Sequence, residues 1–141
     1  MVQNRTIETT SIPITTNGVV LSQGWINQAP TYAFTSTVYP RIATDTQGAS
    51  ISFPLTSASA FYIVGGVNYN HGLFDVTVTP PSVGTQPKGE YNGSSRWIGL
   101  GSMLYLATGL DRTQTYQVEM TNVSPNSWLD ISRVVVFDTP P

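Results

Sequence analysis

Apolar and polar residues alternate along much of the chain with a period of two. The clearest cases are residues 48–55, 72–81 and 115–122, in which every second side chain is apolar. Such alternation is typical of β-strands that bury one face. The residues in between, such as Asp75 and Glu119, are expected to face water. We expect inward-facing side chains at Ile51, Phe53 and Leu55, at Phe74, Val76 and Val78, and at Tyr116, Val118 and Met120.

Turn-forming residues separate these segments. Gly, Pro and paired Thr or Ser recur about every eight to twelve residues, and helical periodicity is nearly absent. Residues 57–67 are apolar almost throughout, which predicts a central strand, and residues 128–138 predict a long strand near the middle of a sheet. About eight or nine short strands without crossover helices predict an all-β, antiparallel two-sheet β-sandwich of the jelly-roll type. Weaker patterns predict strands at 11–16 and 31–39, and a long loop at 80–102 with a short strand near Tyr91.

The composition indicates one globular domain spanning residues 1–141. Of these residues 40% are hydrophobic and only 10% are charged, whereas soluble domains usually carry roughly 25% charged residues. The formal charge of -2 and the scattered Lys and Arg residues argue against binding to nucleic acid or to a membrane surface. Neutral hydrogen-bonding side chains therefore supply most of the polar surface.

Cellular location is predicted from what the chain lacks. There is no cysteine, which excludes disulfides and thiolate metal sites, and no apolar run long enough to span a membrane. The first ten residues do not resemble a secretory leader. We therefore expect a cytoplasmic protein, with secretion as the alternative if a leader has been removed. Three Asn-X-Ser/Thr sequons, at Asn4, Asn92 and Asn122, are about as many as chance gives.

The chain has few residues that could act in catalysis, namely one histidine and eight scattered carboxylates. A Ser-His-Asp arrangement using His71 and Asp75 stays open, but no nucleophile-elbow motif is present. A glycosidase needs two carboxylates that flank the scissile bond, and Glu90 with Asp111 is an arbitrary pair. We expect a protein that is not an enzyme and that has no cofactor and no metal.

Two clusters combine aromatic rings with amide, imidazole or guanidinium groups. An aromatic face covers the C–H patch of a sugar ring, while Asn, His and Arg satisfy the neighbouring hydroxyls. The first cluster could equally be a tight turn, and Trp97 could equally plug one end of the sandwich. The predicted carbohydrate-binding residues are Asn68, Tyr69, Asn70 and His71 in the first cluster, and Tyr91, Arg96 and Trp97 in the second.

Four other residues are expected to serve the scaffold. Trp25 and Trp128 are predicted to pack in the core or at its rim. Asp130 invites comparison with a calcium-binding carboxylate, but calcium needs about six to eight oxygen ligands and Glu8 is the only obvious companion. A capping or turn role is therefore expected for Asp130. Arg133 interrupts an apolar strand, so it should pair with a carboxylate or face a subunit interface.

Several of these segments resemble a recurrent β-sandwich domain of basidiomycete fungi, a jelly roll of the galactose-binding-like type. The matching pieces, between Gln23 and Phe137, are QGWINQ, GASISFPL, FYIVGGVNYNHGLFDV, MLYLATGL, and QVEMTN followed by WLDISRVVV. The chain departs from this family where TVTPPSVG replaces an Asp-Gly hairpin, and in lacking the secretion or membrane signals of many members. Folds of this type serve as lectins, carbohydrate-binding modules and adhesion domains.

The resemblance implies a lectin similar to the leaderless lectins of mushroom fruiting bodies, some of which act in defence. We expect it to bind glycans that contain fucose or galactose, and to be a homodimer because a single shallow site binds weakly. A structural or adhesion domain of a fungal surface protein is the alternative, and a capsid-like jelly roll is a third possibility.

Overall fold

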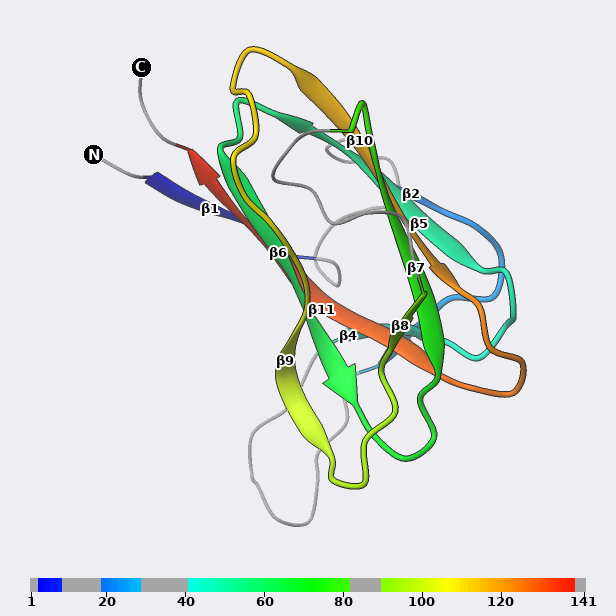
Figure 1. Cartoon of the computed structure of the whole chain (residues 1–141). Helices are drawn as coiled ribbons and strands as arrows, with labels where there is room; N and C mark the ends of the chain where they lie inside the picture. The colour runs from blue at the N-terminus through cyan, green and yellow to red at the C-terminus, as the bar shows by residue number, and fades with distance from the viewer. Residues whose placement is uncertain (1–2, 9–18, 29–40, 82–89, 139–141) are drawn as a thin grey trace.

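Two antiparallel β-sheets face each other in the computed structural model, which describes residues 3–8, 19–28, 41–81 and 90–138 (Figure 1). The strands of the six-stranded sheet are β3 (Ile26–Gln28), β4 (Arg41–Thr44), β11 (Leu129–Asp138), β6 (Ala60–Val67) and β9 (Gly99–Ala107) in that order, with β1 (Gln3–Glu8) also paired to β11. The five-stranded sheet has the order β2 (Val20–Leu21), β5 (Ser50–Thr56), β10 (Thr115–Asn122), β7 (Leu73–Thr79) and β8 (Glu90–Asn92). The described residues contain no helix. The prediction of an all-β, two-sheet jelly-roll sandwich is therefore confirmed.

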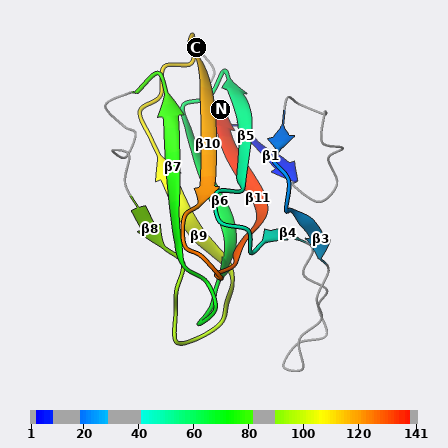
Figure 2. The same cartoon turned by 90° about the vertical axis from the view of Figure 1, so that its right-hand side faces the viewer.

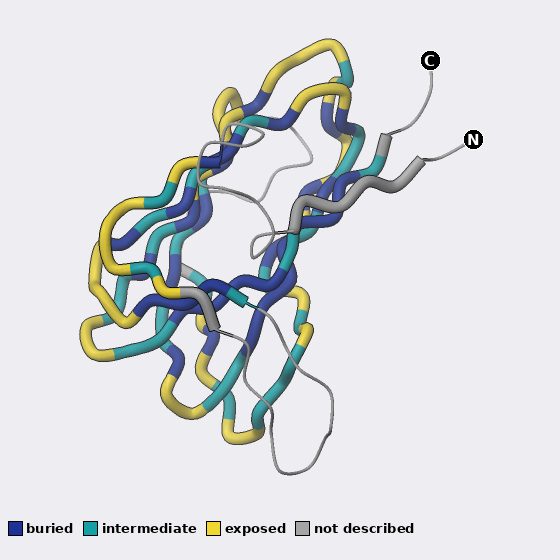
Figure 3. The backbone as a smooth tube through the Cα atoms, turned by 180° about the vertical axis from the view of Figure 1, so that it is seen from behind, coloured by how far each residue is buried: buried dark blue, intermediate teal, exposed yellow. Residues whose placement is uncertain are grey.

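The three alternating segments become strands β5, β7 and β10, and their apolar side chains are buried as predicted. In the pairing of β10 with β5 and with β7, Val118 lies opposite Phe53 on one side and Val78 on the other. The three strands therefore bury a continuous row of apolar side chains. From the other sheet Phe61 meets Phe53 edge to face, with their ring centroids 6.5 Å apart. The core therefore lies between the sheets, while the loops are exposed (Figure 3).

Strand β11 lies in the middle of its sheet, and β6 lies beside it, as their apolar sequences predict. Strand β6 pairs with one edge of β11, and β4 and then β1 pair along the other edge. Figure 2 shows β11 and β6 behind the five-stranded sheet. Neighbouring strands pair with both edges of β11 and of β6, and the inner face of each strand packs in the core. Side chains on the second face are buried as well, such as Asp130 and Val135 on β11.

Some expectations are refined by the structure. Strand β8 confirms a short strand near Tyr91, but the predicted loop ends earlier because β9 begins at Gly99. Asp75 is half-buried rather than facing water, because it sits on β7 beside the edge strand β8. The strands predicted at 11–16 and 31–39 lie outside the described residues. No helix in the described part of the chain is long and apolar enough to cross a membrane.

The connections β6–β7 and β8–β9 lie side by side at one end of the sandwich (Figures 1 and 2). Backbone hydrogen bonds join them: the Asn68 N–H donates to the Gly93 carbonyl (3.2 Å), and the Ser95 N–H donates to the Asn68 carbonyl (2.9 Å). This end carries the polar cluster that contains the only histidine of the chain.

Candidate functional site

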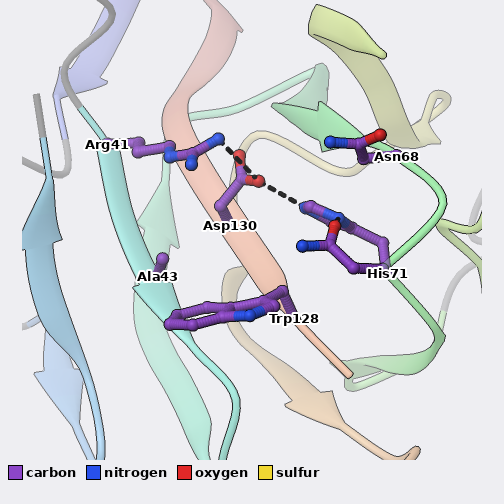
Figure 4. Close-up of a pocket in the computed structure, with 7 residues that line it drawn as sticks. Arg41, Ala43, Asn68, His71, Trp128 and Asp130 are labelled. Carbon is purple, nitrogen blue, oxygen red and sulfur yellow. Dashed lines mark hydrogen bonds and ion pairs between the residues drawn. The ribbon is translucent and has the colours of Figure 1, made fainter. Parts of the chain in front are cut away.

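A pocket of about 240 Å³ opens where the β6–β7 turn meets strands β4 and β11. It is lined by one carboxylate, one guanidinium, one imidazole, two amides and one indole ring (Figure 4). The lining residues are Arg41, Ala43, Asn68, Asn70, His71, Trp128 and Asp130.

Asp130 is the centre of the polar network. Its neighbours Leu129 and Ile131 belong to the core, so strand alternation turns the Asp130 side chain to the opposite face of the sheet. In the register with β4, Asp130 lies opposite Ala43, which makes Arg41 its diagonal neighbour. Arg41 Nη1 lies 3.2 Å from Asp130 Oδ2, and the side chain of Asp130 is almost fully buried. The two charges therefore compensate each other, as a buried carboxylate requires.

Gly66 brings strand β6 against the same carboxylate. Its backbone N–H donates to Asp130 Oδ1 at 2.7 Å. A Cβ atom at position 66 would lie 2.5 Å from Asp130 Oδ2 and 2.7 Å from Oδ1, closer than real Cβ contacts allow. The approach of the buried carboxylate to the β6 backbone therefore requires glycine at this position.

His71 supplies the third donor to Asp130. Its Nε2 lies 2.5 Å from Asp130 Oδ2, and a hydrogen on Nε2 would be donated to the carboxylate. On its other side Nδ1 lies 3.0 Å from the Asn70 side-chain oxygen. The backbone holds the turn as well, because the His71 N–H donates to the Asn68 carbonyl and the Trp128 N–H donates to the Asn70 carbonyl. The segment is thus both a hydrogen-bonded turn and a wall of the pocket.

Trp128 forms the apolar wall. It immediately precedes β11, and its half-buried indole lies on the side of Ala43, across the pocket from Asn68 in Figure 4. Arg41, Asp130 and His71 form a row beside it, joined by the dashed contacts. An aromatic face therefore borders a row of hydrogen-bonding groups. The half-buried position of Trp128 is compatible with the expected packing at the rim of the core, and the structure adds that the residue lines the pocket.

The structure brings together part of the predicted binding set. Asn68, Asn70 and His71 all line the pocket, and Tyr69, between them, is 77% exposed. Arg96 and Trp97 lie on the exposed β8–β9 connection and are not among the pocket's lining residues.

Tyr91 has a position that differs from that of the other predicted binding residues. Its ring stacks on Phe74 and meets Tyr105 edge to face, with both centroid distances 5.7 Å. Burial and, to a smaller extent, the negative charge of Asp75 raise the pKa of the Tyr91 hydroxyl above its usual value. Tyr91 therefore packs against the core at the edge of the sandwich.

Several predictions about the carboxylates are corrected. Asp130 is neither a cap nor a turn residue, because it lies within β11 and binds three donors. The buried carboxylate that contacts His71 is Asp130 rather than Asp75. Asp111 is bound within its own turn, where hydrogen bonds from the hydroxyl and then the backbone N–H of Thr113 lower its pKa.

The described residues hold no group of three or more His, Asp or Glu side chains that could bind a metal ion. In the backbone register of β1 and β11, Glu8 lies opposite Arg133. This register is compatible with the predicted pairing of Arg133 with a carboxylate, which stays a prediction.

Sequence reasoning did not select Arg41, Trp128 and Asp130 as binding residues. They are far from His71 in the chain and meet it only through the pairing of β4, β11 and the β6–β7 turn. One signal was present: Asp130 is a carboxylate between the apolar residues Leu129 and Ile131, and the pair Gly65–Gly66 leaves space for a neighbour. A buried charge of this kind must find a partner.

No protein-family model matches the sequence, and no curated protein matches it. Among solved structures, a family 35 carbohydrate-binding module from Clostridium thermocellum has a TM-score of 0.55 and 10% identity, with 97% of this chain and 99% of that chain covered. The chain shares the β-sandwich fold of this module. A family two carbohydrate esterase from Cellvibrio japonicus has a TM-score of 0.62 and 12% identity, over 99% of this chain and 35% of the esterase. The GH26-CBM35 β-(1,4)-mannanase of Podospora anserina has a TM-score of 0.58 and 12% identity, over 98% of this chain and 28% of the mannanase.

The chain thus spans about a third of the esterase and mannanase chains but almost the whole of the carbohydrate-binding module. At these identities the likeness establishes the fold. What the pocket does has to be argued from its own residues.

Proposed function

We propose that this protein binds carbohydrate without altering it chemically, and that the pocket around Asp130 is the binding site. The observation that carries the proposal is the Trp128 ring beside the row formed by half-buried Arg41 and buried Asp130 and His71. A sugar ring has an apolar C–H face and a rim of hydroxyls. The indole would cover the first, and the charged and amide groups would bind the second.

The fold supports this proposal independently of the pocket. The module from Clostridium thermocellum is a carbohydrate-binding module, and it matches this chain over nearly its full length. In the esterase and the mannanase the matched part is a minor share of each chain. A fold shared with such a module raises the expectation of sugar binding but does not by itself assign it.

The lining of the pocket supports binding rather than catalysis. Asp130 is the only carboxylate among the described lining residues, whereas a glycosidase requires two. The same lining residues include no Ser, Thr or Cys to act as a nucleophile. Both ring nitrogens of His71 already contact an oxygen, of Asn70 and of Asp130, so the ring is held in a fixed orientation.

The sugar is proposed to be a single neutral ring within a glycan. The pocket volume of about 240 Å³ is below the roughly 300–1,000 Å³ of drug-sized sites, which suits about one ring. Fucose and galactose remain the first candidates, and mannose joins them because one similar chain is a mannanase. A fungal lectin that is cytoplasmic and dimeric, with weak single sites strengthened by pairing, is part of the same proposal.

A glycan array followed by calorimetric titration tests the proposal. The wild type is expected to bind at least one glycan that carries fucose, galactose or mannose. Trp128→Ala should abolish this binding, and Gln117→Ala should leave it unchanged because Gln117 is exposed on β10 in the other sheet. Circular dichroism confirms that each variant is folded. The absence of any bound glycan up to millimolar protein, or full binding by a folded Trp128→Ala variant, would overturn the assignment.

A further inference from the structure

Two large aromatic side chains are exposed at the end of the sandwich that holds the pocket. Tyr69 is 77% exposed and Trp97 is 76% exposed. Tyr69 belongs to the β6–β7 connection and Trp97 to the β8–β9 connection, and both connections lie at the same end (Figures 1 and 2). Exposed aromatic rings that are grouped in this way mark binding surfaces more often than scattered single ones do.

The two connections are held together by their backbones. Besides the two bonds of Asn68 with Gly93 and Ser95, the Gly93 N–H donates to the Gly72 carbonyl at 2.9 Å. The Ser95 hydroxyl in turn accepts from the Trp97 N–H at 3.2 Å. The segments that carry the two rings are therefore tied to each other, which lowers the entropy lost when a ligand binds across them.

This aromatic surface begins at the rim of the pocket. Tyr69 stands between Asn68 and Asn70, and both of these line the pocket. The Asn68 side chain accepts from the Tyr69 N–H at 2.8 Å, so the backbone that carries the exposed ring also shapes the pocket wall. A ligand that leaves the pocket on this side would meet Tyr69 first and the β8–β9 connection next.

We infer that Tyr69 and Trp97 form a second sugar subsite, so that the ligand is a linear oligosaccharide of at least two residues. The pocket would hold one residue, and the exposed rings would cover the C–H faces of its neighbours. Arg96, exposed beside Trp97, would offer its planar fork of donors to their hydroxyls. This inference rests on the proposed function, because it requires a sugar in the pocket.

The inference is tested by varying the length of the oligosaccharide. Calorimetric titrations compare mannose with mannopentaose and galactose with β-1,4-galactotetraose. The wild type is expected to bind the longer member of one series about tenfold or more tightly than the single sugar, which is the effect of a central aromatic contact. Trp97→Ala with Tyr69→Ala should reduce the oligosaccharide affinity to that of the single sugar and leave the single-sugar affinity unchanged.

Matched variants make the outcomes distinct. Val20→Ala is the control, because it removes another exposed hydrophobic side chain, which is 58% exposed on β2 of the five-stranded sheet. This variant should bind the single sugar and the oligosaccharide with the affinities of the wild type. Trp97→Phe should restore part of the affinity for the oligosaccharide. If the double variant binds the oligosaccharide as the wild type does, or if it instead lowers the oligomeric mass in light scattering, the second subsite is wrong while the pocket still stands. If the wild type binds a glycan of the array but neither series shows a gain of affinity with oligosaccharide length, the second subsite is wrong and the pocket still stands. If the wild type binds neither series nor any glycan of the array, the proposed function itself fails, and the second subsite with it.

Discussion

His71 Nε2 lies 2.5 Å from Asp130 Oδ2, although the two residues are 59 positions apart in the chain. The contact joins the β6–β7 turn to the middle strand of the six-stranded sheet, and both side chains are buried. Arg41 and the backbone of Gly66 complete the environment of the carboxylate. One buried acidic group therefore holds together a turn and two strands around the candidate pocket.

Removing this carboxylate should destabilise the protein. Asp130→Ala leaves Arg41 and His71 facing each other without the acceptor, and breaking a buried pair in this way costs about 3–5 kcal/mol. Asp130→Asn keeps the shape but lowers the free energy of unfolding by a smaller amount. Urea unfolding measures both variants, and Asp45→Ala is the control because Asp45 is exposed. A stability for Asp130→Ala within about 0.5 kcal/mol of the wild type would contradict the central role of Asp130.

A methyl group at Gly66 should disturb the pocket through the same carboxylate. Gly66→Ala places a Cβ atom against both oxygens of Asp130, and such overpacking costs about 1–3 kcal/mol. Sugar binding should weaken in parallel. The control is Gly93→Ala, since a Cβ there finds its nearest atom at 3.4 Å, an ordinary contact. Equal stability and binding of the two variants in urea unfolding and calorimetry would show that the fit at Gly66 is unimportant.

Tyr91 should make stability depend on alkaline pH. Burial and, secondarily, the charge of Asp75 raise its pKa above the usual 10.0, so folding favours the neutral hydroxyl. For a group whose pKa is raised on folding, the stabilisation is complete below the unfolded value and is lost as pH rises from about 10 through the folded value. The free energy of unfolding of Tyr91→Phe should therefore fall less between pH 9 and pH 11 than that of the wild type.

The exposed Tyr69 offers the comparison for this measurement. Tyr69→Phe removes the same hydroxyl group from a ring that is 77% exposed, so it is the matched control for the loss of one phenol. Urea unfolding at a series of pH values checks both variants. Identical pH profiles for Tyr91→Phe and the wild type would count against the buried position of the hydroxyl.

Asn122 should be a structural amide and not a glycosylation site. Its Nδ2 donates to the carbonyls of Thr46 (3.2 Å) and Ser127 (3.0 Å), and the residue is buried. Asn122→Ala removes both of these hydrogen bonds, although the Thr46 carbonyl still accepts from the Ala49 N–H, and should lower the free energy of unfolding by about 1–3 kcal/mol. Gln117→Ala, at an exposed position, should not lower it. Mass spectrometry of protein secreted from a glycosylating host should find no glycan at Asn122, and an occupied site there would refute this role.

The sequence by itself determined the strands and their inner faces. Alternation with a period of two is a local property, so the burial of Phe53, Val76 and Val118 follows from the spacing of apolar residues alone. The apolar segments of β6 and β11 likewise predicted their central positions. The polar turn around His71 was visible for the same reason, since its unusual residues are contiguous.

Only the tertiary structure decided which residues share the pocket. The carboxylate of Asp130, between two apolar residues, indicated that a partner exists. Which residues are its neighbours follows from the pairing of β11 with β4 and β6, which places Arg41 and Gly66 beside it, and from the β6–β7 turn, which places His71 there. Strand pairing joins segments separated by any length of chain, and its register depends on how all strands bury their apolar faces together. For that reason local patterns located the scaffold, whereas the pocket that Trp128, Asp130 and His71 line together forms only with the paired sheet.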